Sequence, residues 1–352
     1  PHDAVRPLWY GANALLLVWA IALVRRLVRQ QDAAIPGDRR AQWAFWLLTV
    51  VLSVRHVAAV FSNQSNDLPG FVLVLLGMTG MASRRDFAGG LAIGLAAASK
   101  ATPILFLPFL LLLRRFRASA GTMVGTLLGS LAPDVLFPRT DHRYWVESWF
   151  STFVAGINPA DGGNTAAVGN AWKAWNILNQ NLASMFYRLF TEVEPIADHT
   201  FDISLWHMDR GALGLLTLTA QLVVATVLVY AAWRARHLDA PRQALGIGSL
   251  LVCGMVLLSP MSSKSHFCVL VAPIALCVHD FVFRRRDRLV LVCLVVLFVG
   301  ALTSKGVFGR RRGNQLLAHG AVTWCALAAL VGTTRVLVRS AARPALGGST
   351  GS

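Results

Sequence analysis

Apolar segments recur along the whole chain, and polar or arginine-rich loops separate them. Hydrophobic residues make up 55% of the 352 residues and charged residues only 14%. This composition is typical of a protein that crosses a membrane several times and excludes an ordinary soluble domain. Since a helix satisfies its own backbone hydrogen bonds in lipid, we predict an all-α polytopic membrane protein with about eleven transmembrane or re-entrant helices. The expected helices cover residues 8–24, 43–61, 68–82, 88–99, 104–113, 118–137, 213–233, 244–258, 266–283, 289–303 and 316–337.

Arginine clusters follow alternate apolar segments, and this alternation predicts the orientation of the chain. Cytoplasmic loops of membrane proteins carry an excess of Lys and Arg. We therefore place the loops at residues 25–40, 114–117 and 284–288 in the cytoplasm, residue 1 outside and the C-terminus inside. The net charge of +16 fits such loops lying against anionic lipid, so we do not expect nucleic acid as a partner.

One basic cluster breaks this alternation. Lys305, Arg310, Arg311 and Arg312 fall on the outer side of the predicted topology. A basic cluster on that side needs a reason, because it opposes the usual orientation rule. An anionic ligand such as a lipid phosphate would supply the reason; the alternative is a hairpin assigned to the wrong side.

Residues 138–211 differ in character from the rest of the chain. They are rich in Trp, Asn, Gly and carboxylates, which predicts one large extracytoplasmic loop with short amphipathic helices. We expect this loop to lie within a single transmembrane domain at residues 1–346. Residues 347–352 are small and polar, and we predict a disordered tail there.

A lysine interrupts the apolar part of residues 63–117. Three short apolar segments follow one another here, and Lys100 lies between the second and the third, before Pro103. Short, glycine-interrupted segments with polar turns are typical of membrane helices that line a cavity. A lysine at such a turn indicates a binding site. The alternative is a lysine that anchors a helix end by extending to the membrane surface.

Four polar clusters share the predicted external face. Amides hydrogen-bond sugar hydroxyls in both directions, and Lys and Arg hold phosphate oxygens, so these clusters suit a sugar attached to a phosphate. A histidine at a membrane interface can bind phosphate or act as an acid or base, or it can be hydrogen-bonded structure only. We predict donor-phosphate binding by Lys100, Arg188, Lys264 and His266, and sugar or acceptor binding by Asn63, Gln64, Asn66, Asn179, Gln180 and Asn181.

Common catalytic and nucleotide-binding motifs are absent from this sequence. It contains no Walker loop, no GxSxG elbow, no HExxH helix and no paired metal-binding cysteines. It also contains no soluble nucleotide-sugar domain. We therefore predict no metal site and no cofactor.

The order of the polar motifs resembles that of a known family. Residues 89–103 read GGLAIGLAAASKATP, an Asn-Gln-Asn segment at 179–181 is followed by Arg188, and a Ser-Pro pair at 259–260 precedes His266. This order resembles the bacterial integral-membrane glycosyltransferases of family 87, which belong to the GT-C superfamily, over nearly the whole chain. The family includes mannosyltransferases that use a polyprenyl-phosphate mannose donor.

The resemblance implies an inverting transfer of a sugar, with mannose expected, from a polyprenyl-phosphate donor. The implied acceptor is a lipid-linked or cell-envelope glycan on the extracytoplasmic face of the bacterial plasma membrane. In such enzymes an aspartate of the first external loop is the general base, and we expect it upstream of Pro1, in an N-terminal part missing from this sequence. Neither Asp3 nor Asp67 matches its position, so the catalytic residue is unknown. A Ser-Lys-Ser segment at 263–265 stands where many relatives have an aromatic residue and a second histidine, which leaves the role of His266 open.

Two other classes of protein share some of these features. A non-catalytic polyprenyl-phosphate binder or flippase would use the same cavity and cations without an acidic base. A secondary transporter is typically built from two similar halves, and we find no such internal repeat. We therefore expect an enzyme whose partners are a polyprenyl-phosphate sugar donor, a glycan or glycolipid acceptor and membrane lipid.

Overall fold

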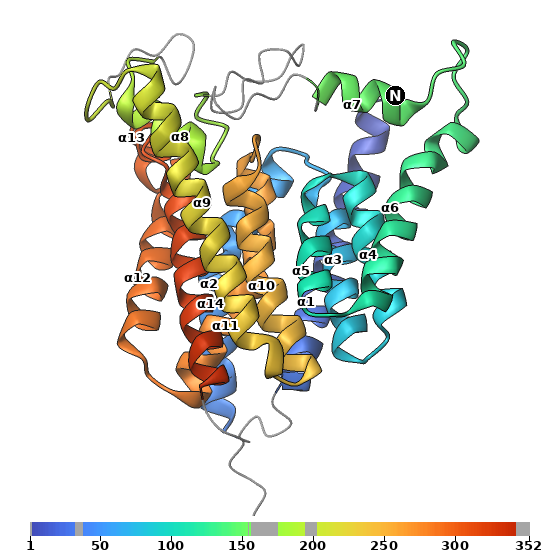
Figure 1. The fold of residues 1–352 in the computed structure, drawn as a ribbon. Coiled ribbons are helices and arrows are strands. Elements are labelled where there is room, and N and C mark those ends of the chain that lie inside the picture. The colour runs from blue at the N-terminus through green and yellow to red at the C-terminus, as the bar shows by residue number, and fades with distance from the viewer. Residues whose placement is uncertain (1, 32–37, 154, 156–174, 194–202, 343–352) are drawn as a thin grey trace, which may run out of the picture.

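The computed structural model describes residues 2–31, 38–153, 155, 175–193 and 203–342 (Figure 1). Within these residues the chain forms fourteen α-helices and no strand, which confirms the all-α prediction for this part. The tail at residues 347–352 lies outside the described residues. The α-helices are α1 (His2–Gln31), α2 (Arg39–Ser62), α3 (Asp67–Ala82), α4 (Asp86–Ser99), α5 (Phe106–Leu112), α6 (Phe116–Leu136), α7 (Trp145–Phe153), α8 (Leu182–Phe190), α9 (Arg210–Arg234), α10 (Ala240–Leu258), α11 (Val271–His279), α12 (Arg288–Leu302), α13 (Lys305–Ala318) and α14 (Ala321–Ala341).

Shorter helical turns join several of these helices. The 3-10 helix η1 (Thr102–Leu105) precedes α5, η4 (Ala235–His237) follows α9, and η5 (Lys264–Leu270) leads into α11. A π-helical turn, η6 (Asp280–Arg284), ends α11.

Within the residues that the structure describes, six helical stretches are long and apolar enough to cross a membrane, so the chain is a multi-pass membrane protein. A seventh span results if the bent pair of α12 and α13 counts as one. The count of eleven stays a prediction, because α3, α4 and Thr102–Leu112 are shorter apolar helices. The six stretches are Val5–Gln31, Arg39–Ser62, Arg210–His237, Ala240–Leu258, Lys264–Arg284 and Ala321–Ala341.

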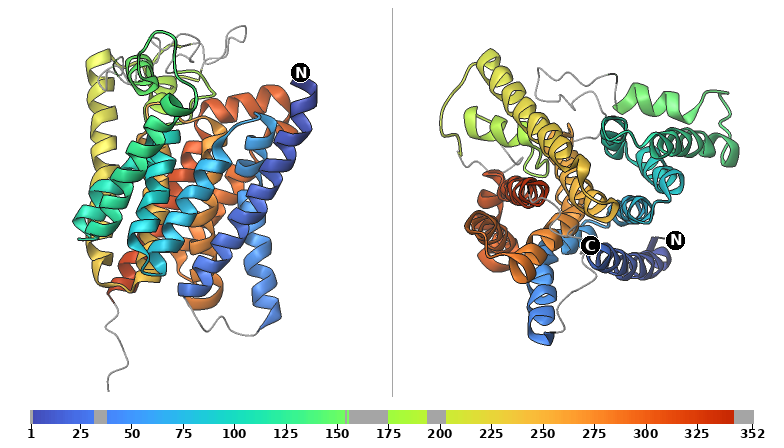
Figure 2. Two further views of the ribbon diagram at one scale, coloured as in Figure 1. Left: turned by 90° about the vertical axis from the view of Figure 1, so that its right-hand side faces the viewer. Right: turned by 60° about the horizontal axis from the view of Figure 1, so that its bottom comes forward.

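The long helices form a bundle with two distinct ends (Figures 1 and 2). One end carries α7, α8 and α13 together with the start of α1. The opposite end carries the arginine-containing turns after α3, α5 and η6. We call these the loop end and the arginine end. The predicted alternation of loops therefore agrees with the arrangement of the helices, whereas the assignment of the arginine end to the cytoplasm stays a prediction.

The predicted helix at residues 316–337 is in fact parts of two helices. α13 ends at Ala318, and Gly320, with a φ of 79°, starts the turn into α14. A left-handed backbone conformation is easy for glycine and strained for other residues. Because apolar residues continue on both sides of Gly320, the hydropathy of the sequence did not reveal this break.

Glycines bring the backbones of α4 and α6 into close contact. A Cβ atom added at Gly90 would lie 2.0 Å from the Ala118 carbonyl oxygen, and one at Gly121 would lie 2.2 Å from that of Phe87. Small residues at helix–helix contacts allow such an approach in membrane proteins. The glycines of residues 89–103 that indicated a cavity in the sequence therefore include positions that serve helix packing.

Candidate functional site

The polar turn between α2 and α3 places a carboxylate inside the bundle. α2 ends at Ser62, and Asp67 is the first residue of α3. The Asp67 side chain is only 5% exposed, and the Ser65 hydroxyl donates a hydrogen bond to its Oδ2. A buried carboxylate needs a partner, because removing an unpaired charge from water is expensive.

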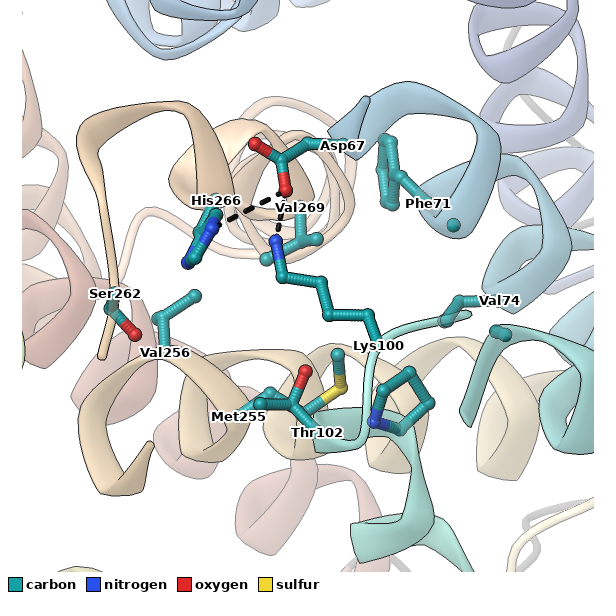
Figure 3. Close-up of a pocket in the computed structure, with 13 residues that line it drawn as sticks. Asp67, Phe71, Val74, Lys100, Thr102, Met255, Val256, Ser262, His266 and Val269 are labelled. Carbon is teal, nitrogen blue, oxygen red and sulfur yellow. Dashed lines mark hydrogen bonds and ion pairs between the residues drawn. The ribbon is translucent and has the colours of Figure 1, made fainter. Parts of the chain in front are cut away.

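Lys100 supplies that partner. α4 ends at Ser99, and Lys100 follows it with an extended backbone (φ −161°, ψ 101°). α4 cannot continue through Pro103, because proline has no N–H to donate to a helical hydrogen bond. Lys100 Nζ forms an ion pair with Asp67 Oδ1 (Figure 3). The turn after α4 therefore brings the ammonium group to the start of α3.

His266 approaches the same carboxylate oxygen from η5. The Ser263 backbone N–H donates to His266 Nδ1 at 3.1 Å, so Nδ1 is an acceptor and the proton of the neutral ring sits on Nε2. His266 Nε2 lies 3.6 Å from Asp67 Oδ1 (Figure 3). This distance is longer than a direct hydrogen bond. The start of η5 thus fixes both the ring orientation and the tautomer, with Nε2 on the side of Asp67.

Asp67, Lys100 and His266 line one pocket, which we call the Asp67 pocket. Its cavity volume is about 30 Å³, and it is partly open to the surroundings. Charges interact more strongly beside apolar walls than in water. A pocket with apolar walls and a few convergent polar groups suits the polar head of an amphiphilic ligand. The apolar walls include Phe71, Val74, Met255, Val256 and Val269 (Figure 3).

The amides at residues 179–181 hold the loop before η5. Asn179 Oδ1 accepts a hydrogen bond from the Ser262 N–H at 2.9 Å, and Asn181 Nδ2 donates to the Pro260 carbonyl at 2.6 Å. Both asparagines are buried. Asn-Gln-Asn and Ser-Pro, which are far apart in the sequence, therefore form one unit that positions His266. The sugar-binding role of these amides stays a prediction.

Arg188 and Gln180 connect the segment at residues 179–181 to the end of α13. Arg188 is 0% exposed; its Nε donates to the Ala318 carbonyl at 2.7 Å and its Nη1 to the Asn179 carbonyl at 2.8 Å. Gln180 Nε2 donates to the Leu317 carbonyl at 2.9 Å. Burial lowers the pKa of Arg188 to about 9, so the guanidinium stays protonated at neutral pH. Arg188 does not line the Asp67 pocket, and its contact with a donor phosphate stays a prediction.

The remaining predicted residues lie elsewhere at the loop end. Lys264 and Asn63 line a second pocket. Gln64 and Asn66 are exposed at the turn after α2, where Asn66 Oδ1 accepts a hydrogen bond from Trp9 Nε1 at 3.1 Å. The structure therefore brings together Lys100 and His266, and separates them from the other candidates.

Asp67, on which this pocket centres, is not among the site residues predicted from the sequence. It does not match the position of the general base in the resembled family. A different signal was available, since a carboxylate directly before an apolar run needs a cation. Among the lysines expected on the external face, Lys100 is the nearest to Asp67 in the sequence.

Comparison with protein families identifies the family of this chain. A model of glycosyltransferase family 87 matches residues 1–260, which is more than half of the 352-residue chain. The matched region holds Asp67 and Lys100 and ends just before η5. No curated protein and no solved structure matches the chain.

Proposed function

Because this chain belongs to glycosyltransferase family 87, we propose that its Asp67 pocket binds the phosphate of a polyprenyl-phosphate sugar donor. The chain is a multi-pass membrane glycosyltransferase. We propose mannose as the sugar, a lipid-linked or cell-envelope glycan as the acceptor, and the outer face of the bacterial plasma membrane as the place of transfer.

The observation that carries this proposal is the convergence of two donors on one carboxylate oxygen. Lys100 Nζ and His266 Nε2 both face Asp67 Oδ1. Groups arranged around one carboxylate oxygen can also hold an oxygen of a phosphate, which has similar size and charge. Asp67 then keeps both donors in place while the pocket is empty, and a lipid phosphate bound beside it engages them.

The same two groups support the breaking of the bond between sugar and phosphate. In an inverting transfer the acceptor hydroxyl oxygen forms a bond to the sugar C1 as the C1–oxygen bond to the phosphate breaks. Negative charge then grows on the departing phosphate, and Lys100 and the His266 Nε2–H stabilise it. The hydroxyl proton passes to a general base. We do not assign this role to Asp67, because its two oxygens already accept from Lys100 and Ser65.

Sugar transfer by the purified protein tests the proposal. We expect the detergent-solubilised protein to transfer mannose from polyprenyl-phosphate mannose to a glycolipid acceptor, and to transfer none from GDP-mannose. The product is measured by mass spectrometry of the acceptor. A matched control is Arg117→Gln, which removes an exposed cation at the arginine end. Transfer from GDP-mannose by the pure protein would contradict the proposal.

A further inference from the structure

A second pocket lies on the other side of the start of η5. It is bounded by α2, η5 and α13, has a cavity volume of about 690 Å³ and is partly open to the surroundings. Lys264 lines this pocket, whereas Ser262 and His266 line the Asp67 pocket. Successive residues of a 3-10 helix are a third of a turn apart, so neighbouring positions face different sides. The start of η5 therefore separates the two pockets.

Three cations line the second pocket, one from each bounding helix: Arg55, Lys264 and Lys305. Arg55 Nη1 donates to the Gly300 carbonyl and to Thr303 Oγ1, which fixes the guanidinium without neutralising it. The lining contains no carboxylate, and none of the three cations forms an ion pair within the part of the chain that the structure describes. Like charges gathered beside apolar helices are unfavourable unless an anion joins them.

Exposed apolar side chains line part of this pocket. Val54 of α2, Leu302 of α12 and Val307 of α13 line it and are 53%, 41% and 60% exposed. Exposed aliphatic side chains on the long helices of a membrane protein contact lipid chains. The pocket therefore combines three cations with exposed apolar side chains, which fits a phosphate carried on an apolar chain.

α13 explains why this region is basic at the loop end. It bends by 95° from α12 and lies across the end of the bundle (Figure 2). Arg310, Arg311 and Arg312 are exposed on it. A helix that lies flat and exposes arginines suits the membrane surface, where it attracts anionic head groups.

We propose that the second pocket, between α2, η5 and α13, is an anionic-lipid site. Arg55, Lys264 and Lys305 bind the phosphate, and the apolar chain leaves past Val54 and Leu302. A polyprenyl phosphate and a bilayer phospholipid share this chemistry. The site is distinct from the Asp67 pocket and does not rest on the proposed transfer reaction.

Photo-crosslinking with lipid probes tests this site. The purified protein in phosphatidylcholine nanodiscs is exposed to polyprenyl phosphate or phosphatidylglycerol, each with a photoreactive group near the phosphate, and labelled peptides are identified by mass spectrometry. We expect labelling of residues 54–62 and 301–307. The double variant Lys264→Gln/Lys305→Gln should reduce that labelling by roughly tenfold or more, since each charge-assisted contact to a phosphate contributes that order of affinity. Arg117→Gln is the matched control and should label as the native protein does.

The probes also separate the sources of the ligand. Displacement by unlabelled polyprenyl phosphate but not by phosphatidylglycerol assigns the pocket to the carrier lipid, and displacement by both assigns it to anionic lipids in general. Equal labelling by a phosphatidylcholine probe would overturn the proposal, because the pocket would then select no anion. If the double variant unfolds, Lys305→Gln alone serves, since Lys305 is exposed. Unchanged labelling in a folded variant would also overturn it, whatever the result of the mannose-transfer assay.

Discussion

Lys264 and His266 lie two residues apart on η5 and line different pockets. The sequence predicted that both bind the same donor phosphate. Residue spacing alone could not separate them, because the two faces of η5 become distinct only once the loop before it is fixed by Asn179 and Asn181. The structure therefore places the two side chains in separate pockets, so their proposed roles can be tested one at a time.

The His266 ring is expected to act through the proton on Nε2. His266→Ala removes this donor and should reduce turnover roughly tenfold to a thousandfold, the usual range for losing one transition-state hydrogen bond. His266→Gln places an amide N–H near the Nε2 position and should retain more of the activity. Turnover per folded molecule is measured with polyprenyl-phosphate mannose. Equal losses in the two variants would show that the hydrogen-bond donor is not what matters.

Arg188 is expected to stabilise the fold. Arg188→Met leaves the buried carbonyls of Ala318 and Asn179 without this donor, which should lower the free energy of unfolding by about 2–5 kcal/mol. Thermal unfolding in detergent measures the change. Arg117→Met removes an exposed arginine and should change stability by no more than about 0.5 kcal/mol. If Arg188→Met is as stable as this control and yet transfers sugar slowly, the phosphate role predicted from the sequence is the better account.

The contact between α4 and α6 should tolerate no side chain at its glycines. A Cβ atom at Gly94 would lie 2.2 Å from the Thr122 carbonyl oxygen, so Gly94→Ala should destabilise the protein by about 1–3 kcal/mol. Gly11→Ala is the matched control, because nothing lies within 4 Å of its added Cβ atom. Both variants are compared by thermal unfolding in one detergent. A Gly94→Ala protein as stable as Gly11→Ala would mean that the two helices lie farther apart.

The sequence predicted the helical elements better than their ends and breaks. Hydropathy located α3, α4 and α5 as separate helices, because Arg84 and Pro103 interrupt the apolar pattern. The break at Gly320 was missed, since a single glycine in an apolar run does not by itself mark a turn. α3 and α4 are short apolar helices, and their length alone does not show whether they cross the membrane. The number of spans could therefore not be derived from the sequence.

The candidate site could be predicted only in part. The energetic cost of a charge between apolar helices identified Lys100, and that argument needs no knowledge of the neighbours. Its pairing with Asp67 depends on how α3 and α4 pack, which residue spacing does not contain. The buried hydrogen bonds of Asn181 were likewise out of reach, because a surface amide and a buried amide look alike in a sequence.

The most direct test of the account is the turnover of Lys100 variants with a polyprenyl-phosphate mannose donor. Lys100→Met removes the charge that faces Asp67 and leaves that buried carboxylate unpaired, so the folded yield should fall. Per folded molecule, transfer should slow roughly tenfold to a thousandfold. Lys100→Arg keeps the charge and should recover part of the rate. Arg117→Gln controls for the loss of a cation far from the pocket and should leave turnover unchanged. A well-folded Lys100→Met protein with near-native turnover would contradict the assignment of the Asp67 pocket to the donor phosphate.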